Sequence, residues 1–124
     1  MKIPEKMREV LREEGVVAIT TSGKTGPHMV NTWNTYLQIT EDEHLLIPAG
    51  HMNLTEANLA GDCNVLLTLG SRKVLGMHGA GTGFLVKGTA KFLSSGPEFD
   101  AIKANFVWAR AALVVTIMSV TQTL

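Results

Sequence analysis

The sequence has a single cysteine, no long apolar run and no net charge. These three features argue, in turn, against a cysteine-stabilised protein, a membrane-spanning helix and a protein that binds nucleic acid through excess positive charge. One cysteine, Cys63, excludes a disulfide framework, a cysteine-based zinc site and an iron–sulfur cluster within one chain. No apolar run approaches the roughly 20 residues that a membrane-spanning helix needs. Eleven lysines and arginines balance eleven aspartates and glutamates. The chain therefore lacks the excess positive charge with which proteins neutralise nucleic-acid phosphates.

Length and composition predict one globular domain over residues 1–124. Hydrophobic residues make up 45% of the 124 positions and charged residues 18%, which is ordinary for a chain that buries a core. The first 14 residues alternate in charge and lack the apolar centre of a signal peptide, which predicts a cytoplasmic protein. Zero net charge gives little electrostatic protection against self-association, so we expect an oligomer.

The pattern of apolar residues predicts a mainly β chain. Short helices are expected between Pro4 and Gly15, over 53–60 and over 97–109, the second beginning with a capping box from Asn53 to Glu56. Strands are expected over 16–21, 28–40, 45–48, 65–69, 84–92 and 112–120, the last apolar on both faces. Six strands joined by short links predict an antiparallel barrel.

Residues 70–83 do not fit this regular pattern. They contain five of the twelve glycines, and the sequence predicts a long irregular loop, a feature usually functional or mobile in compact domains. The spacing matches neither a Walker phosphate loop nor a dinucleotide-binding fingerprint.

Residues that could perform acid–base or metal chemistry are scattered. No two of the four histidines are spaced i, i+4, so no metal site is predicted. Cys63 has no base beside it and is interpreted as a small apolar residue. The carboxylates at 13–14 and 41–43 are explained by solvated faces and turns. No catalytic residue is assigned.

The segment Val30–Tyr36 is unusually polar for a strand. Asparagines and threonines alternate there around Trp33 and Tyr36, an arrangement that suits a flat heterocycle with polar edges. A half-exposed edge strand with an ordinary tryptophan explains the same residues, and composition alone favours that simpler interpretation.

Lysine and arginine are absent from Thr25 to Ser71. A phosphate bound by this region would depend on backbone N–H groups, Thr55 and the start of the helix near Asn53. Arg72 or Lys73 could add charge from the glycine-rich segment. Alternatively, these two cations only keep a loop soluble.

Eight blocks in the same order carry a resemblance over nearly the whole chain. They are residues 14–19, 26–34, 55–58, 67–74, 81–85, 96–99, 108–114 and 122–124. On these blocks the chain resembles the small bacterial FMN-binding proteins of Desulfovibrio type, within the pyridoxamine 5'-phosphate oxidase-like split-barrel superfamily.

The resemblance implies a six-stranded antiparallel split barrel that forms a homodimer, with FMN bound non-covalently in clefts between the subunits. The polar strand would border the ribityl chain and ring, residues 48–50 the ring edge, and residues 53–55 the phosphate. Trp108 and Leu124 would come from the partner subunit, with Tyr36 nearby. The implied cofactor-binding residues, with Arg72 as an added cation, are Asn31, Thr32, Trp33, Asn34, Thr35, Tyr36, Pro48, Ala49, Gly50, Asn53, Leu54, Thr55, Arg72, Trp108 and Leu124.

Leu54 departs from the family pattern, which generally has lysine or arginine at this position. The phosphate would then depend on backbone amides, Thr55 and either Arg72 or Lys73.

Three functions remain open from the sequence. The first is electron transfer between bound FMN and a separate redox protein. The second is a flavin-dependent oxidoreductase, a reductase or a pyridoxamine-phosphate-oxidase-like enzyme, acting on a small molecule. The third is a cofactor-free barrel, either an oligonucleotide-binding module or a structural dimer; neutral charge and few aromatic residues outside the Trp33 region disfavour the nucleic-acid version.

Overall fold

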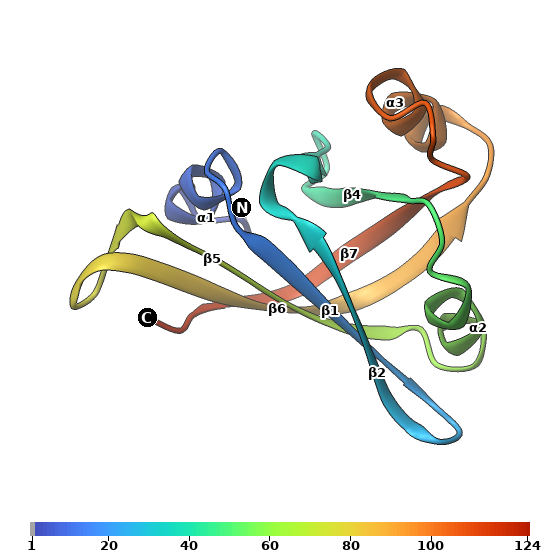
Figure 1. Cartoon of the computed structure of the whole chain (residues 1–124), viewed down its shortest axis with the longest axis horizontal. Coiled ribbons are helices and arrows are strands. Elements are labelled where there is room, and N and C mark those ends of the chain that lie inside the picture. Colours follow the sequence, from blue (N-terminus) through green and yellow to red (C-terminus); the bar gives the residue numbers. More distant parts are fainter. Residues whose placement is uncertain (1) are drawn as a thin grey trace.

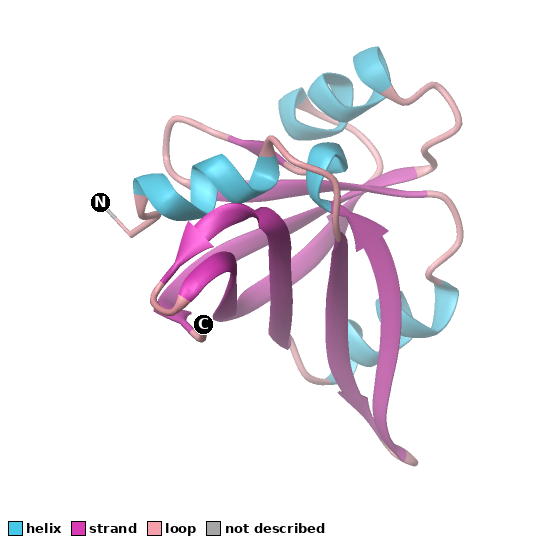
Figure 2. Ribbon diagram, turned by 60° about the vertical axis from the view of Figure 1, so that its left-hand side comes forward, coloured by secondary structure: helices cyan, strands magenta, loops and turns pink. Residues whose placement is uncertain are grey.

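A computed structural model describes residues 2–124, and in this range one antiparallel sheet has seven strands in the order β2-β1-β5-β6-β7-β4-β3. The strands are β1 (Val16–Gly23), β2 (Gly26–Trp33), β3 (Gln38–Ile39), β4 (His44–Ala49), β5 (Asn64–Gly76), β6 (Gly79–Leu93) and β7 (Ala111–Gln122). The helices are α1 (Glu5–Leu11), the 3-10 turn η1 (Asn34–Tyr36), α2 (Asn53–Gly61) and α3 (Pro97–Asn105). The sheet is strongly curled and the helices lie around it (Figures 1 and 2). The predicted barrel is confirmed, with one strand more than expected.

The main core lies inside the curl of the sheet. Met7, Val10 and Leu11 of α1 are buried against it, as their spacing predicts. A smaller apolar cluster lies under α3, where Ile102 packs with residues of β4 and β7. Strand β7 faces both clusters, so residues 111–115 are buried on both sides, whereas Thr116 and Met118 are exposed. The doubly buried strand predicted over 112–120 is therefore confirmed only in its first half.

The strand predicted over 28–40 is interrupted at Asn34. Strand β2 ends at Trp33, a 3-10 turn follows, and pairing resumes in the two-residue strand β3. The Asn34 side chain is fully buried, and its Nδ2 donates to the carbonyl oxygens of Val10 (3.2 Å), Glu13 (3.2 Å) and Gly70 (2.9 Å). These tertiary bonds turn the chain inward, which the alternating pattern does not show.

The prediction of an irregular loop over residues 70–83 is wrong. Strands β5 and β6 continue through it and pair up to Gly76 and Gly79, with a register irregularity between Ser71 and Leu75. Gly79 and Gly81 have φ of +126° and +104°, conformations that side-chain-bearing residues rarely adopt. The glycines thus permit a tightly turned β-hairpin rather than a flexible loop.

Three predicted helix ends also differ. Helix α1 ends at Leu11, and Gly15, instead of capping it, lies against the Gly70 carbonyl and the Asn34 side chain. In α2, Asn53 is already the first helical residue, so it is one position too late to cap, and Met52 precedes it without a side-chain cap bond in the described chain.

Helix α3 ends at Asn105 rather than 109. Phe106 leaves the helical conformation (φ −134°, ψ 82°), and Lys103 Nζ donates to the carbonyl oxygen of Ala109 at 2.8 Å. The chain from Phe106 therefore folds back toward the start of β7 instead of extending the helix.

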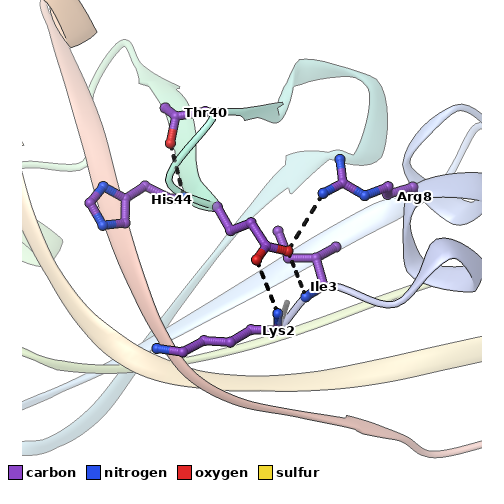
Figure 3. Close-up of polar contacts among 6 residues, drawn as sticks. Lys2, Ile3, Arg8, Thr40 and His44 are labelled. Atoms are coloured by element: carbon purple, nitrogen blue, oxygen red, sulfur yellow. Dashed lines mark hydrogen bonds and ion pairs between the residues drawn. The ribbon is translucent and has the colours of Figure 1, made fainter.

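Glu43 ties the N-terminal segment to the β3–β4 turn through contacts with Lys2, Ile3 and Arg8, which are labelled in Figure 3. Its carboxylate accepts hydrogen bonds from the backbone N–H groups of Ile3 (3.0 Å) and Lys2 (3.1 Å), and Arg8 lies 3.6 Å away. These donors, Ile3 first, hold the pKa of Glu43 below its ordinary value, with a smaller contribution from the charge of Arg8.

We expect Glu43→Gln to remove part of the pH dependence of stability. Because the folded-state pKa of Glu43 is lowered, its contribution is complete above the ordinary glutamate pKa of about 4.3 and is lost as the pH falls through the lowered value. Denaturant unfolding from pH 7 to pH 3 should show the wild type more stable than Glu43→Gln near neutrality, with the difference shrinking in acid. Parallel stability curves for the two proteins would contradict this role.

Candidate functional site

The end of β4 and the start of α2 form the first part of the candidate site. Pro48 and Ala49 are buried and pair with β7. Proline has no backbone N–H to donate, but β3 pairs only with Leu45 and Leu46, so Pro48 interrupts no hydrogen bond between β3 and β4. Beyond the strand, a Cβ added at Gly50 would lie 3.3 Å from ring carbons of Trp108. The backbone at residues 48–50 is thus placed beside an indole ring.

Helix α2 presents an uncapped N-terminus. Met52 immediately precedes the first turn and has a left-handed conformation (φ 61°, ψ 34°). Among residues 2–124, no side chain caps this turn. Free N–H groups of a first helical turn attract anions. Leu54 is exposed, whereas Thr55 is only 1% exposed. The hydroxyl of Thr55 is buried without a hydrogen-bond partner in the described structure.

Arg110 is a further residue at this turn that sequence reasoning missed. Its Nε and Nη2 donate to the carbonyl oxygen of His51 (3.0 and 2.7 Å), and its Nη1 pairs with Glu56 Oε1 at 3.0 Å. Its backbone N–H donates to the carbonyl oxygen of Ala49 at 2.9 Å. No local pattern could have identified it, because the pairing of β4 with β7 brings it there.

Three aromatic rings gather beside this strand end. Tyr36 lies 4.9 Å from Phe106 and 6.0 Å from Trp108 between ring centroids, and Phe106 lies 5.6 Å from Trp108. Trp108 reaches Gly50 from its own chain, whereas the resemblance assigned it to a partner subunit. Phe106 was not among the predicted site residues.

A second part of the site is a groove along the β5–β6 hairpin. Its volume is about 890 Å³, and the predicted residues Trp33, Arg72 and Leu124 line it together with Glu14 and Lys73. Thr82 Oγ1 donates to the carbonyl oxygen of Leu124 at 2.7 Å and ties the chain end to the hairpin. The groove therefore combines an exposed indole with the side chains of two cations and one glutamate.

Within one subunit, the two parts of the site lie at opposite ends of the long axis of the molecule. In Figure 1, α2 is at one end of the long axis, and the β5–β6 hairpin with the C-terminus is at the other. Arg72 therefore does not lie beside the α2 N-terminus of its own chain. Strand β2 exposes Asn31 and Trp33 on one face and buries Thr32 on the other, and Thr35 is exposed in η1. Asn34 directs its Nδ2 to backbone carbonyls, and its Oδ1 is buried without a hydrogen-bond partner in the described structure.

The remaining polar side chains of residues 2–124 offer no metal site. Among residues 2–124, no three His, Cys, Asp or Glu side chains group closely enough to hold a metal ion, and Cys63 is exposed and free. None of the helices in this range has both the length and the apolar character needed to cross a membrane.

Comparisons with known proteins identify the family of the chain. The sequence matches the family described as pyridoxamine 5'-phosphate oxidase over residues 3–123. It is 57% identical over 122 residues to the FMN-binding protein of Nitratidesulfovibrio vulgaris (strain DSM 19637 / Miyazaki F), covering 98% of this chain and 99% of that protein.

Two solved structures share the fold at low identity. An FMN-binding protein from Syntrophomonas wolfei is 18% identical with a TM-score of 0.72, over 97% of this chain and 85% of that one. HupZ from group A Streptococcus is 14% identical with a TM-score of 0.78, over 97% and 93%.

Proposed function

The chain belongs to the pyridoxamine 5'-phosphate oxidase family, and from this premise we propose that it is a flavoprotein that binds FMN non-covalently. The observation that carries the proposal is the unpartnered hydroxyl of Thr55 at the uncapped N-terminus of α2. A buried hydroxyl without a hydrogen-bond partner destabilises the folded protein unless a ligand forms a hydrogen bond with it. A relative at 57% identity is named an FMN-binding protein, and a phosphate ester is the group that such a helix start suits.

The residues present suit both ends of this cofactor. First-turn amides of α2 and Thr55 would bind the phosphate, and the backbone of residues 48–50 would lie along the ring edge beside Trp108 and Tyr36. The exposed polar side chains of Asn31 and Thr35 are available for the ribityl hydroxyls. The isoalloxazine would supply the one- and two-electron redox chemistry, and the protein would supply position and polarity.

We further propose a homodimer that completes the site from two chains. One face of the sheet carries Val16, Trp33, Met29 and Leu66, which register pairing aligns and which are 44–62% exposed. Exposed apolar groups gathered on one face are typical of an interface. A second copy would bring its hairpin groove, with Leu124, toward the α2 end of the first chain, which one chain cannot do alone.

Electron transfer with a redox protein is the first proposed role, because the charged pair Arg110–Glu56 beside the phosphate turn holds that turn and no catalytic acid or base is assigned beside the proposed ring site. Glu14, Arg72 and Lys73 in the hairpin groove favour the alternative, a flavin-dependent oxidoreductase with a small charged substrate. Sustained consumption of reduced nicotinamide cofactor by the FMN-loaded protein would support the enzyme. Reduction only by a protein partner would support the carrier.

The proposed cofactor is tested by titrating protein stripped of ligand with FMN and with riboflavin, followed by gel filtration and sedimentation. We expect one yellow FMN per chain, tighter binding of FMN than of riboflavin, and sedimentation as a dimer. Protein that stays colourless after FMN is added and the excess removed would overturn the proposal.

We expect Leu54→Lys to tighten FMN binding. Leu54 is exposed in the first turn of α2, so a lysine there would add a charge-assisted phosphate contact worth about 1.5–3 kcal/mol, roughly ten- to a hundredfold in affinity. Leu54→Gln is the matched control, with a long polar side chain and no charge. Unchanged or weaker FMN binding by the lysine variant would place the phosphate elsewhere.

A further inference from the structure

Arg110 connects the two segments that form the candidate phosphate turn. Through its guanidinium it donates twice to the carbonyl oxygen of His51, and through its backbone it donates to that of Ala49. Its Nη1 contacts Glu56 in the first turn of α2 at 3.0 Å. One side chain thus bridges the chain before the helix and the helix itself.

The guanidinium keeps hydrogen-bonding capacity beyond these contacts. A guanidinium has five N–H groups, and the side-chain contacts above use one each on Nε, Nη1 and Nη2. The side chain is 35% exposed, and its far face lies against the Phe92 ring, 5.5 Å from the centroid. These contacts fix the position of the guanidinium, and two of its N–H groups therefore remain available to an anion.

We propose that Arg110 supplies the positive charge of the phosphate turn and makes this chain select phosphorylated ligands over unphosphorylated ones. The inference rests on the proposed flavin function and adds the residue that replaces a cation at position 54. The nine-residue helix α2 and the unpartnered Thr55 hydroxyl mark an anion site. Arg110 lies at that site. Arg72 belongs to the β5–β6 hairpin, at the opposite end of the long axis of the molecule. Glu56 partly neutralises Arg110 and moderates the affinity.

The test compares FMN with riboflavin in Arg110→Gln, Arg110→Lys and the wild type, all stripped of ligand. We expect Arg110→Gln to weaken FMN binding about tenfold or more with little change for riboflavin, and Arg110→Lys to recover part of the loss. Arg12→Gln is the matched control, because Arg12 also pairs with a glutamate (Glu5, 3.3 Å) but lies just after α1, at its C-cap, and is exposed. Equal losses for both ligands would mean that Arg110 only maintains the fold, and would overturn the inference.

Inorganic phosphate provides a readout without a flavin. At constant ionic strength, phosphate should raise the melting temperature of the ligand-free wild type but not of Arg110→Gln. Glu56→Gln, which keeps the arginine, should strengthen FMN binding about threefold without affecting riboflavin. Wild-type protein that binds neither FMN nor phosphate would overturn the proposed function as well. Wild-type binding with undiminished FMN selectivity in Arg110→Gln, or no gain in Glu56→Gln, would overturn only this inference.

Discussion

Asn34→Ala is expected to lower the free energy of unfolding by about 2 kcal/mol. The side chain is 0% exposed, and its amide is shared among three backbone carbonyl oxygens from α1, the segment after it, and β5. Alanine would remove this donor from all three; the Val10 carbonyl keeps the N–H of Glu13 at 3.0 Å, whereas the carbonyls of Glu13 and Gly70 lose it at a cost of about 1 kcal/mol or more each. A domain of this size has only about 5–15 kcal/mol of stability in total.

Urea unfolding followed by tryptophan fluorescence measures this loss. Asn31→Ala is the control, because Asn31 is an exposed asparagine on the neighbouring strand β2, and we expect it to change stability by less than about 0.5 kcal/mol. Asn34→Asp should be at least as damaging as alanine, since its oxygens would face carbonyl oxygens. A loss below about 1 kcal/mol for Asn34→Ala would show that the surrounding backbone recruits other donors.

Thr55→Val is expected to weaken FMN binding about ten- to a hundredfold while leaving the ligand-free protein as stable as the wild type or more so. The two effects have opposite directions for one reason. The Thr55 hydroxyl has no partner within the described chain, so replacing it with a methyl group removes a desolvation cost from the ligand-free protein. The same replacement would remove the proposed phosphate donor from the FMN-loaded protein.

Thr21→Val is the matched control for this effect. Thr21 is equally buried, but its hydroxyl accepts a hydrogen bond from Asn58 Nδ2 at 3.2 Å. Valine there should cost about 1 kcal/mol of stability and leave FMN affinity unchanged. Thermal unfolding of ligand-free protein and flavin titration measure both variants. Destabilisation of ligand-free Thr55→Val, or undiminished FMN binding, would show that the hydroxyl does not serve the ligand.

Local patterns predicted most elements because neighbouring residues decide them. The β-branched run in β1 and the alternation in β6 gave the correct strands, and the apolar spacing in α1 gave the correct buried face. The errors lie where distant segments meet. Asn34 interrupts a strand because Val10, Glu13 and Gly70 carbonyls surround it, and none of them is near it in the sequence.

The candidate site divides in the same way. The start of α2 and Thr55 could be located from the sequence, because a helix start with a hydroxyl residue is a local feature. Phe106 and Arg110 could not, because they reach the site only when α3 ends early and β7 pairs with β4. The predicted grouping of Arg72 with the phosphate turn failed within one chain because the long hairpin carries Arg72 away from α2.

The sequence by itself determined that the middle of the chain, from Thr25 to Ser71, has no cation, so any phosphate bound there needs amides, hydroxyls or a charge from elsewhere. Only the tertiary structure decided which cation lies beside the start of α2. Antiparallel pairing places Ala49 opposite Ala111 and thereby sets Arg110 beside the first turn of α2. Composition records how many charges a chain has, but the register of its strands determines which of them share a site.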